Sequence, residues 1–286
     1  MPTLVQRLAS VIKTNQMILR ITSFFILCTF FTACSTNPLS GKSQLTLLPE
    51  SELQTMATQE YQQFLSTNKV VSTSNNRDAE MVRRVGQRIT SAVEKYYADK
   101  GLTDKLKGFK WEYNLVDDKA VNAWCMPGGK IVVYTGILPI TQNEAALAAV
   151  VGHEVSHALL QHGNQRVSQG LLQQLGGVAL SVAVANKPAE TQNLFLGAYG
   201  VSTAVGVLLP FSRKHELEAD RYGLIWTAMA GYNPQEAIGL WQRMESASKG
   251  QKPPEFLSTH PTEGRRIEQL QKYMPEALTY YKPMGR

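Results

Sequence analysis

Cysteine is scarce in this sequence, with three residues in a chain of 286. Cys28 and Cys34 fall within and directly after an apolar N-terminal segment, which leaves Cys125 without a partner in the rest of the chain. The sequence therefore excludes a disulfide framework and also a structural zinc site built from cysteines. Any metal site must be made of histidine and carboxylate side chains.

Clusters of lysine and arginine interleaved with aromatic residues are also lacking. The net charge is +6, but Arg7, Lys13 and Arg20 contribute to it within a segment that has no acidic residue before Cys34. The excess of positive charge in the remaining chain is therefore small. We expect no nucleic acid among the partners of this protein.

The N-terminal segment has the features of a targeting sequence. Its uncharged run at residues 21–33 follows basic residues and is shorter than the roughly 20 residues that span a bilayer. Small residues directly before Cys34 resemble the lipobox of bacterial lipoproteins. We therefore predict a lipoprotein signal peptide at 1–33, lipidation of Cys34 and a tether at 34–50, with an ordinary signal peptide or a short anchor as the alternative. The predicted location is the periplasm with a lipid anchor in a membrane, and Ser35 after the cysteine favours the outer membrane.

The rest of the chain, residues 51–286, is predicted to be a single α+β domain, mostly helical with a small β-sheet or hairpin. Apolar residues at helical spacing indicate two helices, and apolar alternation followed by a β-branched run indicates two strands. The helices are expected at 51–65 and 78–97, and the strands at 109–116 and 130–135.

A further helix is predicted from a capping box formed by Thr141 and Glu144. The apolar, alanine-rich segment that follows extends this helix to about Gly163. Small side chains let other elements approach closely, as a buried helix requires.

Two long apolar runs, 171–185 and 194–211, follow this helix. Both contain glycine, and the second is at the lower length limit for a membrane span. We expect a buried or surface-facing helical hairpin, with a re-entrant or spanning pair as the alternative.

The most informative segment is His153-Glu154-Val155-Ser156-His157 within the alanine-rich helix. Positions four apart share one face of a helix, so His153 and His157 can offer two imidazoles to one metal ion. This is the H-E-x-x-H pattern of zinc peptidases, in which the glutamate acts as general base toward a water molecule. His162 lies nine residues after His153, about half a turn around the helix, and is expected to point away.

A third metal ligand is predicted from the acidic segment that begins at His215. Glu216 and Asp220 are four residues apart and share a helix face, whereas Glu218 is rotated away from them. We assign Glu216 to the metal and Asp220 to the ring N–H of a ligating histidine, which such a carboxylate orients. An exposed acidic helix face is the alternative.

Taken together, these motifs resemble the HtpX-, BepA- and LoiP-like zinc metallopeptidases, the gluzincin family of the CAAX prenyl protease, in its periplasmic lipoprotein type. Besides the two motifs above, the resemblance is carried by Asn122-Ala123, by Pro127-Gly128-Gly129, and by Ser258-Thr259-His260-Pro261 followed by Arg266. It implies a zincin-like fold with a catalytic core at about 78–274 and one Zn²⁺ on His153, His157 and Glu216. It also implies that His260 lies near the metal, where an equivalent histidine can occupy the open coordination position and hold the enzyme inactive.

The small sheet beside the metal helix is expected to bind polypeptide substrates, since the edge of a sheet can hold an extended chain by backbone hydrogen bonds. The predicted substrate-binding residues are Asn122, Ala123, Gly128 and Gly129. A plain structural hairpin is the alternative.

The predicted reaction is zinc-dependent hydrolysis of peptide bonds with Glu154 as the general base. His260 and Arg266 are the candidates for stabilising the developing oxyanion, although Arg266 could instead form a salt bridge on a terminal helix. The predicted function is an endopeptidase of the bacterial cell envelope that degrades misfolded or partly unfolded proteins. The alternatives are a latent protease that acts mainly as a chaperone, and a membrane-embedded enzyme of the prenyl-protease kind.

Overall fold

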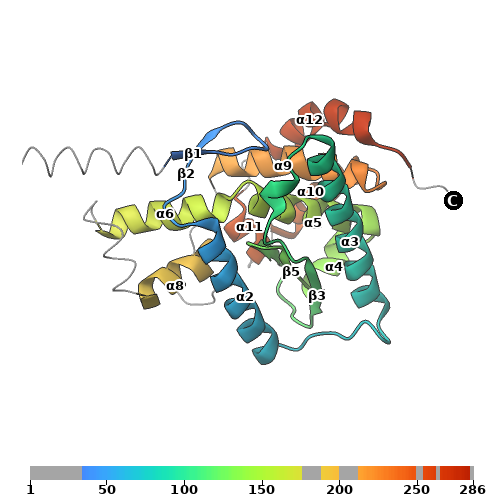
Figure 1. Ribbon diagram of the computed structural model, residues 1–286. Helices are drawn as coiled ribbons and strands as arrows, with labels where there is room; N and C mark the ends of the chain where they lie inside the picture. The colour runs from blue at the N-terminus through green and yellow to red at the C-terminus, as the bar shows by residue number, and fades with distance from the viewer. Residues whose placement is uncertain (1–33, 176–187, 200–211, 249–253, 262–264, 284–286) are drawn as a thin grey trace, which may run out of the picture.

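The computed structural model describes residues 34–175, 188–199, 212–248, 254–261 and 265–283. These residues form the predicted α+β fold, in which helices dominate and two small sheets are present (Figure 1). The strands are β1 (Cys34–Thr36), β2 (Ser43–Leu45), β3 (Glu112–Val116), β4 (Ala123–Met126) and β5 (Lys130–Tyr134). The helices are α2 (Glu50–Thr67), α3 (Arg77–Asp99), η1 (Thr103–Leu106), η2 (Thr135–Ile137), α4 (Leu138–Thr141), α5 (Glu144–Leu159), α6 (His162–Leu175), α8 (Pro188–Ala198), α9 (Arg213–Met229), α10 (Glu236–Ser248), α11 (Glu255–Thr259) and α12 (Arg266–Tyr280).

Helix α5 lies at the centre of the core. Its side chains are buried from Ala146 to Leu159, because α3, α9, α10 and β4 all pack against it. In Figure 1, α9 lies between α5 and α12. The segment that carries the H-E-x-x-H pattern is therefore surrounded by other elements.

Two glycines set the distance between α5 and α9. A Cβ atom added to Gly152 would lie 2.8 Å from the carbonyl oxygen of Gly223, and one added to Gly223 would lie 2.9 Å from the backbone nitrogen of His153. Neither contact is sterically allowed. The helices approach this closely only because both positions are glycine, and the approach brings the acidic face of α9 against His153.

The main sheet has the strand order β3-β5-β4. β5 pairs in parallel with β3 and antiparallel with β4, in a register that places Ala123 opposite Val133 and Met126 opposite Lys130. Besides the two strands predicted at 109–116 and 130–135, the sheet contains a third strand, β4, from the segment between them. β4 forms one edge of the sheet and packs against α5.

The start of α5 differs from the predicted capping box. Thr141 ends the short helix α4, and Gln142 adopts a left-handed conformation with φ 65° that separates the two helices. Asn143 is the N-cap, and its side chain accepts a hydrogen bond of 2.9 Å from the backbone N–H of Ala146. Glu144 instead accepts a hydrogen bond from the hydroxyl of Tyr232. Asparagine is at least as good an N-cap as threonine, and the N-cap lies two residues later than predicted.

The end of α5 also differs from the prediction. The helix stops at Leu159, and Gln161 adopts a φ of 55° before α6 begins at His162. The chain therefore changes direction within the segment that was predicted to continue to Gly163. The orientation predicted for His162 assumed that this residue continues the helix of His153, so that prediction is wrong.

Residues 34–50, predicted as a tether, are folded onto the domain. β1 and β2 form an antiparallel hairpin, and the buried side chain of Asn37 donates a hydrogen bond to the carbonyl oxygen of Leu159. The hydroxyl of Tyr222 donates to the carbonyl oxygen of Leu39 at 2.7 Å. These contacts anchor the segment to α5 and α9, so it does not act as a free linker. The predicted signal peptide, residues 1–33, lies outside the described residues.

The predicted apolar hairpin is described in part. α6 and α8 pack together through the buried residues Val167, Leu171, Leu194 and Phe195, whereas residues 176–187 and 200–211 lie outside the described residues. Within the part of the chain that the structure describes, no helix combines the length and the apolar character needed to cross a bilayer.

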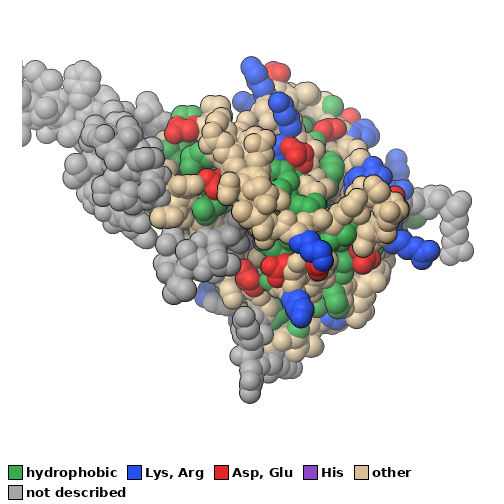
Figure 2. Space-filling view, turned by 90° about the horizontal axis from the view of Figure 1, so that it is seen from below, with side chains coloured by type: hydrophobic (Ala, Val, Ile, Leu, Met, Phe, Trp, Pro, Cys, Tyr) green, Lys and Arg blue, Asp and Glu red, His purple; other side chains and the backbone are tan. Residues whose placement is uncertain are grey.

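Charges of both signs occur together on the surface. On the face shown in Figure 2, basic and acidic side chains lie interspersed among polar and apolar ones. The expected absence of a nucleic-acid partner stays a prediction.

Candidate metal centre

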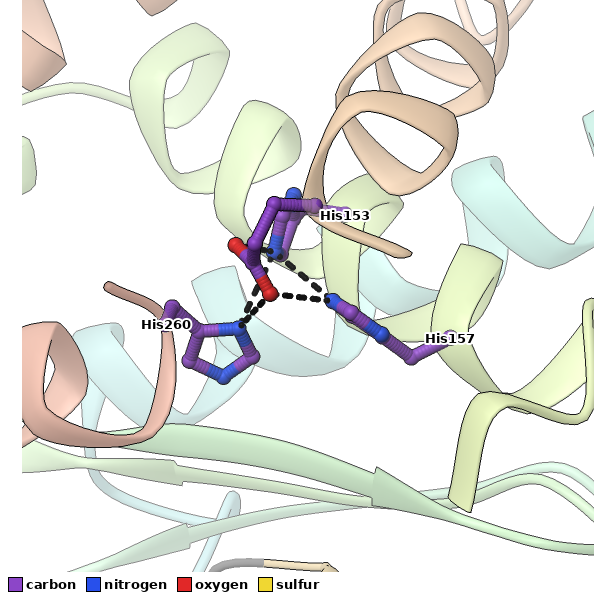
Figure 3. Close-up of side chains that lie close together, drawn as sticks. His153, His157 and His260 are labelled. Carbon is purple, nitrogen blue, oxygen red and sulfur yellow. Dashed lines mark hydrogen bonds and ion pairs between the residues drawn. The ribbon is translucent and has the colours of Figure 1, made fainter. Parts of the chain in front are cut away.

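Four buried side chains from three elements form a cluster of metal-binding groups. His153 and His157 come from α5, Glu216 from the first turn of α9, and His260 from the residue that follows α11. One donor atom from each residue lies within 4.8 Å of all the others. Figure 3 shows the imidazoles of His153, His157 and His260 turned toward one another. The structure thus brings together the three predicted ligands and adds a fourth donor.

His153 is oriented by the carboxylate predicted for this purpose. Its Nδ1 donates a hydrogen bond to Oδ1 of Asp220 at 2.9 Å, which leaves Nε2 facing the cluster. Burial lowers the pKa of His153, but the bonds to Asp220 and Glu216 outweigh this effect and raise the pKa to about 9. A hydrogen bond to carboxylate is what makes an imidazole a stronger metal ligand.

His157 completes the pair on α5. Its Nε2 lies 3.0 Å from Nε2 of His153 and 3.4 Å from Oε1 of Glu216. Burial lowers the pKa of His157 well below its ordinary value, so this imidazole is neutral and has a lone pair for a metal ion.

Glu216 supplies the anionic donor. Burial alone raises the pKa of this carboxyl, but its close contacts with His260, His153 and His157 hold the pKa well below its usual range. Glu216 therefore stays ionised at the centre of the cluster. Two imidazoles and one carboxylate are the protein ligands that catalytic zinc sites commonly use.

His260 lies in the position of a fourth donor. Its Nδ1 is 3.1 Å from Oε1 of Glu216 and 3.2 Å from Nε2 of His153. The ring stacks on Phe256 at a centroid distance of 4.4 Å, and its Nε2 lies 3.4 Å from Oε1 of Glu154. Burial lowers the pKa of His260 to about 4, which keeps the ring neutral at physiological pH.

Glu154 is buried beside the cluster but is not part of it. Among the described residues, its Oε1 has no hydrogen-bond partner within normal distance. Burial raises the pKa of Glu154 to about 8. A carboxyl group with such a pKa can both accept and release a proton near neutral pH, as a general base and acid must.

Arg266 holds two of the acidic side chains of α9, Glu216 and Asp220, together. It donates from Nη1 to Oε2 of Glu216 at 3.0 Å and from Nη2 to Oδ1 of Asp220 at 2.5 Å. Its guanidinium lies over the ring of Trp241, 3.4 Å from the centroid. Arg266 thus forms salt bridges with two carboxylates of the site. This agrees with the alternative prediction of a salt bridge in place of an oxyanion role.

Asn122 and Ala123 lie at the start of edge strand β4 and line a small cavity beside the cluster. Oδ1 of Asn122 accepts a hydrogen bond from the N–H of Ala123 at 2.9 Å. The residues that line the cavity are Asn122, Ala123, Trp124, Cys125, Glu154, His157, Tyr199, Thr259 and His260. Two of the predicted substrate-binding residues, Asn122 just before β4 and Ala123 within it, thus share one cavity with Glu154.

Gly128 and Gly129 do not line this cavity. They form the turn between β4 and β5 with φ angles of 75° and 84°, and the N–H of Gly129 donates to the carbonyl oxygen of Met126. A side chain on Gly129 would overlap Trp111. These glycines are required for the turn geometry, so the structure gives no support to their predicted role in substrate binding.

A second group of histidines was missed by sequence reasoning. Nδ1 of His162 lies 3.0 Å from Nδ1 of His157, and Nε2 of His162 lies 3.1 Å from Oε2 of Glu218. His215 stacks on His162 with a centroid distance of 4.2 Å. His162 was expected to point away, and it does not because the chain turns at Gln161.

The donor set fits a zinc ion. Zinc prefers nitrogen and carboxylate oxygen ligands in a tetrahedral arrangement, and the four buried donors can bind one ion. The hydrogen bond from His153 to Asp220 provides the outer support that zinc-bound imidazoles usually have. The prediction of one Zn²⁺ as cofactor is confirmed by this cluster and by the family comparison that follows.

Comparison with known proteins finds a peptidase family and several proteases that are similar to this chain. Residues 84–274 match the model of peptidase family M48. The mitochondrial metalloendopeptidase OMA1 of Saccharomyces cerevisiae is 35% identical over 201 residues, which cover 66% of this chain and 55% of that protein. Its counterpart in Bos taurus is 31% identical over 255 residues, with coverages of 87% and 47%. The beta-barrel assembly-enhancing protease of Escherichia coli is 28% identical over 165 residues, with coverages of 55% and 33%. The chain thus spans about half the length of the mitochondrial relatives.

These relatives correct the predicted location. A periplasmic lipoprotein, anchored to the outer membrane through Cys34, is contradicted by the several similar proteins that are named mitochondrial. The prediction relied on a basic, acid-free and apolar N-terminal segment, and such features are shared by targeting sequences of different compartments. The lipoprotein subtype of the resemblance is likewise unsupported.

The broader resemblance is confirmed, since the family match covers both ligand-bearing helices and His260. The predicted enzyme class, a zinc metalloendopeptidase, agrees with the family and with the names of these relatives. The chain belongs to peptidase family M48.

Proposed function

We propose that this protein is a zinc-dependent endopeptidase that hydrolyses extended segments of partly unfolded polypeptides. One observation carries the proposal. The buried carboxyl group of Glu154 shares a small cavity with the metal donors His157 and His260 and with edge strand β4. A purely structural metal site needs no such group, because its ligands alone fulfil the role.

His153, His157 and Glu216 would hold the zinc ion. When bound, zinc supplies a Lewis acid that polarises the scissile carbonyl group and acidifies a water molecule. Glu154 takes the proton from the attacking water molecule and then delivers it to the nitrogen of the leaving peptide. The carboxyl group of Glu154 lies in the same cavity as the metal donors His157 and His260, so it is placed where both transfers must occur.

Edge strand β4 supports a preference for extended chain. Ala123 and Cys125 of β4 line the same cavity as Glu154, and β5 pairs with the opposite edge of the strand. A polypeptide that is added along β4 would use backbone hydrogen bonds, which select conformation more than sequence. Folded proteins rarely present such segments, so the proposed substrates are misfolded or partly unfolded proteins, and the proposed role is quality control.

His260 supports a latent resting state of this enzyme. With Nδ1 directed at Glu216 and His153, its imidazole occupies the place of a fourth ligand. A catalytic zinc site needs one position free for water or substrate. We propose that His260 withdraws from the metal when a substrate binds, in agreement with the inactive arrangement that the family resemblance implies.

The proposal is tested with the full-length chain and casein as a substrate without stable fold. Cleavage should stop on treatment with a zinc chelator and return on addition of zinc. The Glu216→Ala variant should bind less zinc and should not cleave at any practical zinc concentration. Cleavage that persists after complete removal of zinc would exclude the proposed mechanism.

A further inference from the structure

A chain of four side chains leads from the surface to the metal cluster. Nζ of Lys42 lies 2.5 Å from Oε1 of Glu218, and Oε2 of Glu218 lies 3.1 Å from Nε2 of His162. Nδ1 of His162 lies 3.0 Å from Nδ1 of His157, whose Nε2 faces the cluster. The cluster thus has an ordered set of polar contacts behind His157 that differs from the single carboxylate behind His153.

The carboxylate of Glu218 determines which nitrogen atoms of His162 and His157 carry protons. A carboxylate can only accept hydrogen bonds, so Nε2 of His162 must carry a proton and donate it to Glu218. A neutral imidazole has one N–H, and Nδ1 of His162 is therefore an acceptor. Nδ1 of His157 must then be the donor in the contact between the two rings. The same rule leaves Nε2 of His157 unprotonated, with its lone pair directed toward the other three donors.

The position of His162 is fixed independently of this hydrogen bond. His215 stacks on its ring at 4.2 Å with an interplanar angle of 18°, and Nε2 of His215 lies 3.1 Å from Oε1 of Gln165. His162 is fully buried, and the Glu218 side chain is only 16% exposed. A ring that is held on its face and at both nitrogens has little freedom to rotate, so it can set the orientation of its neighbour.

We propose that Glu218 and His162 are positioning residues that fix the tautomer of His157 and so prepare its Nε2 to bind the metal. They act on His157 as Asp220 acts on His153, with one imidazole interposed between carboxylate and ligand. Lys42 is 63% exposed and contributes little to this effect, because water screens its charge.

This inference rests on the metal site of the proposed function, but its test does not use peptide cleavage. The full-length chain is prepared with ¹⁵N-labelled histidine, and the five imidazoles are assigned by NMR. In the metal-free protein, we expect the proton of His157 on Nδ1 and that of His162 on Nε2. In the Glu218→Ala variant, the signal of His157 should show a mixture of both tautomers. A proton on Nδ1 of His162 in the unmodified protein would overturn the proposal.

Zinc affinity gives a second, independent readout. The dissociation constant, measured by competition with a chromophoric chelator, should rise about 10- to 100-fold in Glu218→Ala. Glu276→Ala is the matched control, since it removes a carboxylate that pairs with Arg221 of the same helix α9 but lies outside the histidine chain. Its dissociation constant should stay within about twofold of the unmodified protein. Equal zinc affinity in the two variants would show that Glu218 has no positioning role, whether or not the protein proves to be a peptidase.

Discussion

Nε2 of His260 lies 3.4 Å from Oε1 of Glu154, while Nδ1 on the other side of the same ring faces the metal cluster. The imidazole thus separates the proposed general base from the place where a water molecule would have to bind. His260 therefore both provides the fourth metal donor and blocks the position that a water molecule would occupy. Movement of His260 would free the metal and Glu154 together.

This arrangement predicts that His260→Ala increases peptide cleavage. The substitution leaves His153, His157 and Glu216 as ligands and opens the fourth position. The rate of casein cleavage at saturating zinc should rise several-fold, and zinc affinity should fall. A decrease in the cleavage rate at full zinc occupancy would instead assign His260 to stabilisation of the transition state.

The approach of α5 and α9 predicts a strong effect of Gly223→Ala. The added methyl group would lie 2.9 Å from the backbone nitrogen of His153, so the two helices must separate. Overpacking of this kind costs about 1–3 kcal/mol of unfolding free energy, measurable by urea denaturation. Zinc affinity should fall as well, because Glu216 moves with α9.

Gly239→Ala provides the control for this experiment. Gly239 lies inside helix α10, and the atom nearest to an added Cβ is Nη1 of Arg243 at 3.2 Å, with no backbone atom of another described element within 4 Å. Alanine is the better helix former there, by about 0.5–1 kcal/mol. A destabilisation of the same size in both variants would contradict the role of Gly223 in the helix contact.

The raised pKa of Glu154 predicts that the stability of the metal-free protein depends on pH. Burial raises its pKa from 4.5 to about 8, so the folded state binds more protons than the unfolded state between these values. Stability should therefore decrease as the pH rises from about 5 to 8, by about 1.4 kcal/mol per unit of pKa shift. Glu154→Gln removes this contribution.

The difference in unfolding free energy between the unmodified protein and the Glu154→Gln variant separates the contribution of Glu154 from those of other titrating groups. His153, whose pKa is raised to about 9, contributes stability that is complete below pH 6.5 and lost as the pH rises through 9. This loss occurs in both proteins and cancels to first order. Urea denaturation at several pH values should show a difference that grows with pH, and a constant difference would refute the raised pKa of Glu154.

Arg266→Met should destabilise the fold strongly. The guanidinium is buried and pairs with both Glu216 and Asp220, so its removal takes a permanent positive charge away from two buried carboxylates. Loss of one partner from such a group costs about 3–5 kcal/mol. Arg221→Met removes the more exposed pair with Glu276 and should cost about 1 kcal/mol or less. Similar losses in denaturation experiments would contradict the structural importance assigned to Arg266.

The parts of the site that depend on helix periodicity were predictable from the sequence. His153 and His157 share a face of α5, Glu216 and Asp220 share a face of α9, and the structure brings these two faces together. The position of His260 depends on packing between distant segments. It was expected only because the chain resembles a known family.

The errors arose where the backbone departs from regular structure. Gln142 and Gln161 both adopt positive φ angles, which glutamine rarely does, and they shift both ends of α5. His162 was therefore placed on the wrong side. Gly128 and Gly129 belong to a sequence motif of the family but form a turn, since a motif does not distinguish binding residues from residues that shape the chain.

The most direct test of the account is the rate of casein cleavage by zinc-loaded Glu154→Gln, with the zinc content determined on the same sample. Glu154 is not among the metal donors, so the variant should bind zinc as the unmodified protein does. Cleavage should fall at least about 100-fold, because the amide cannot accept the proton of the attacking water molecule. Cleavage at the unmodified rate would show that Glu154 is not the general base and would contradict the proposed mechanism.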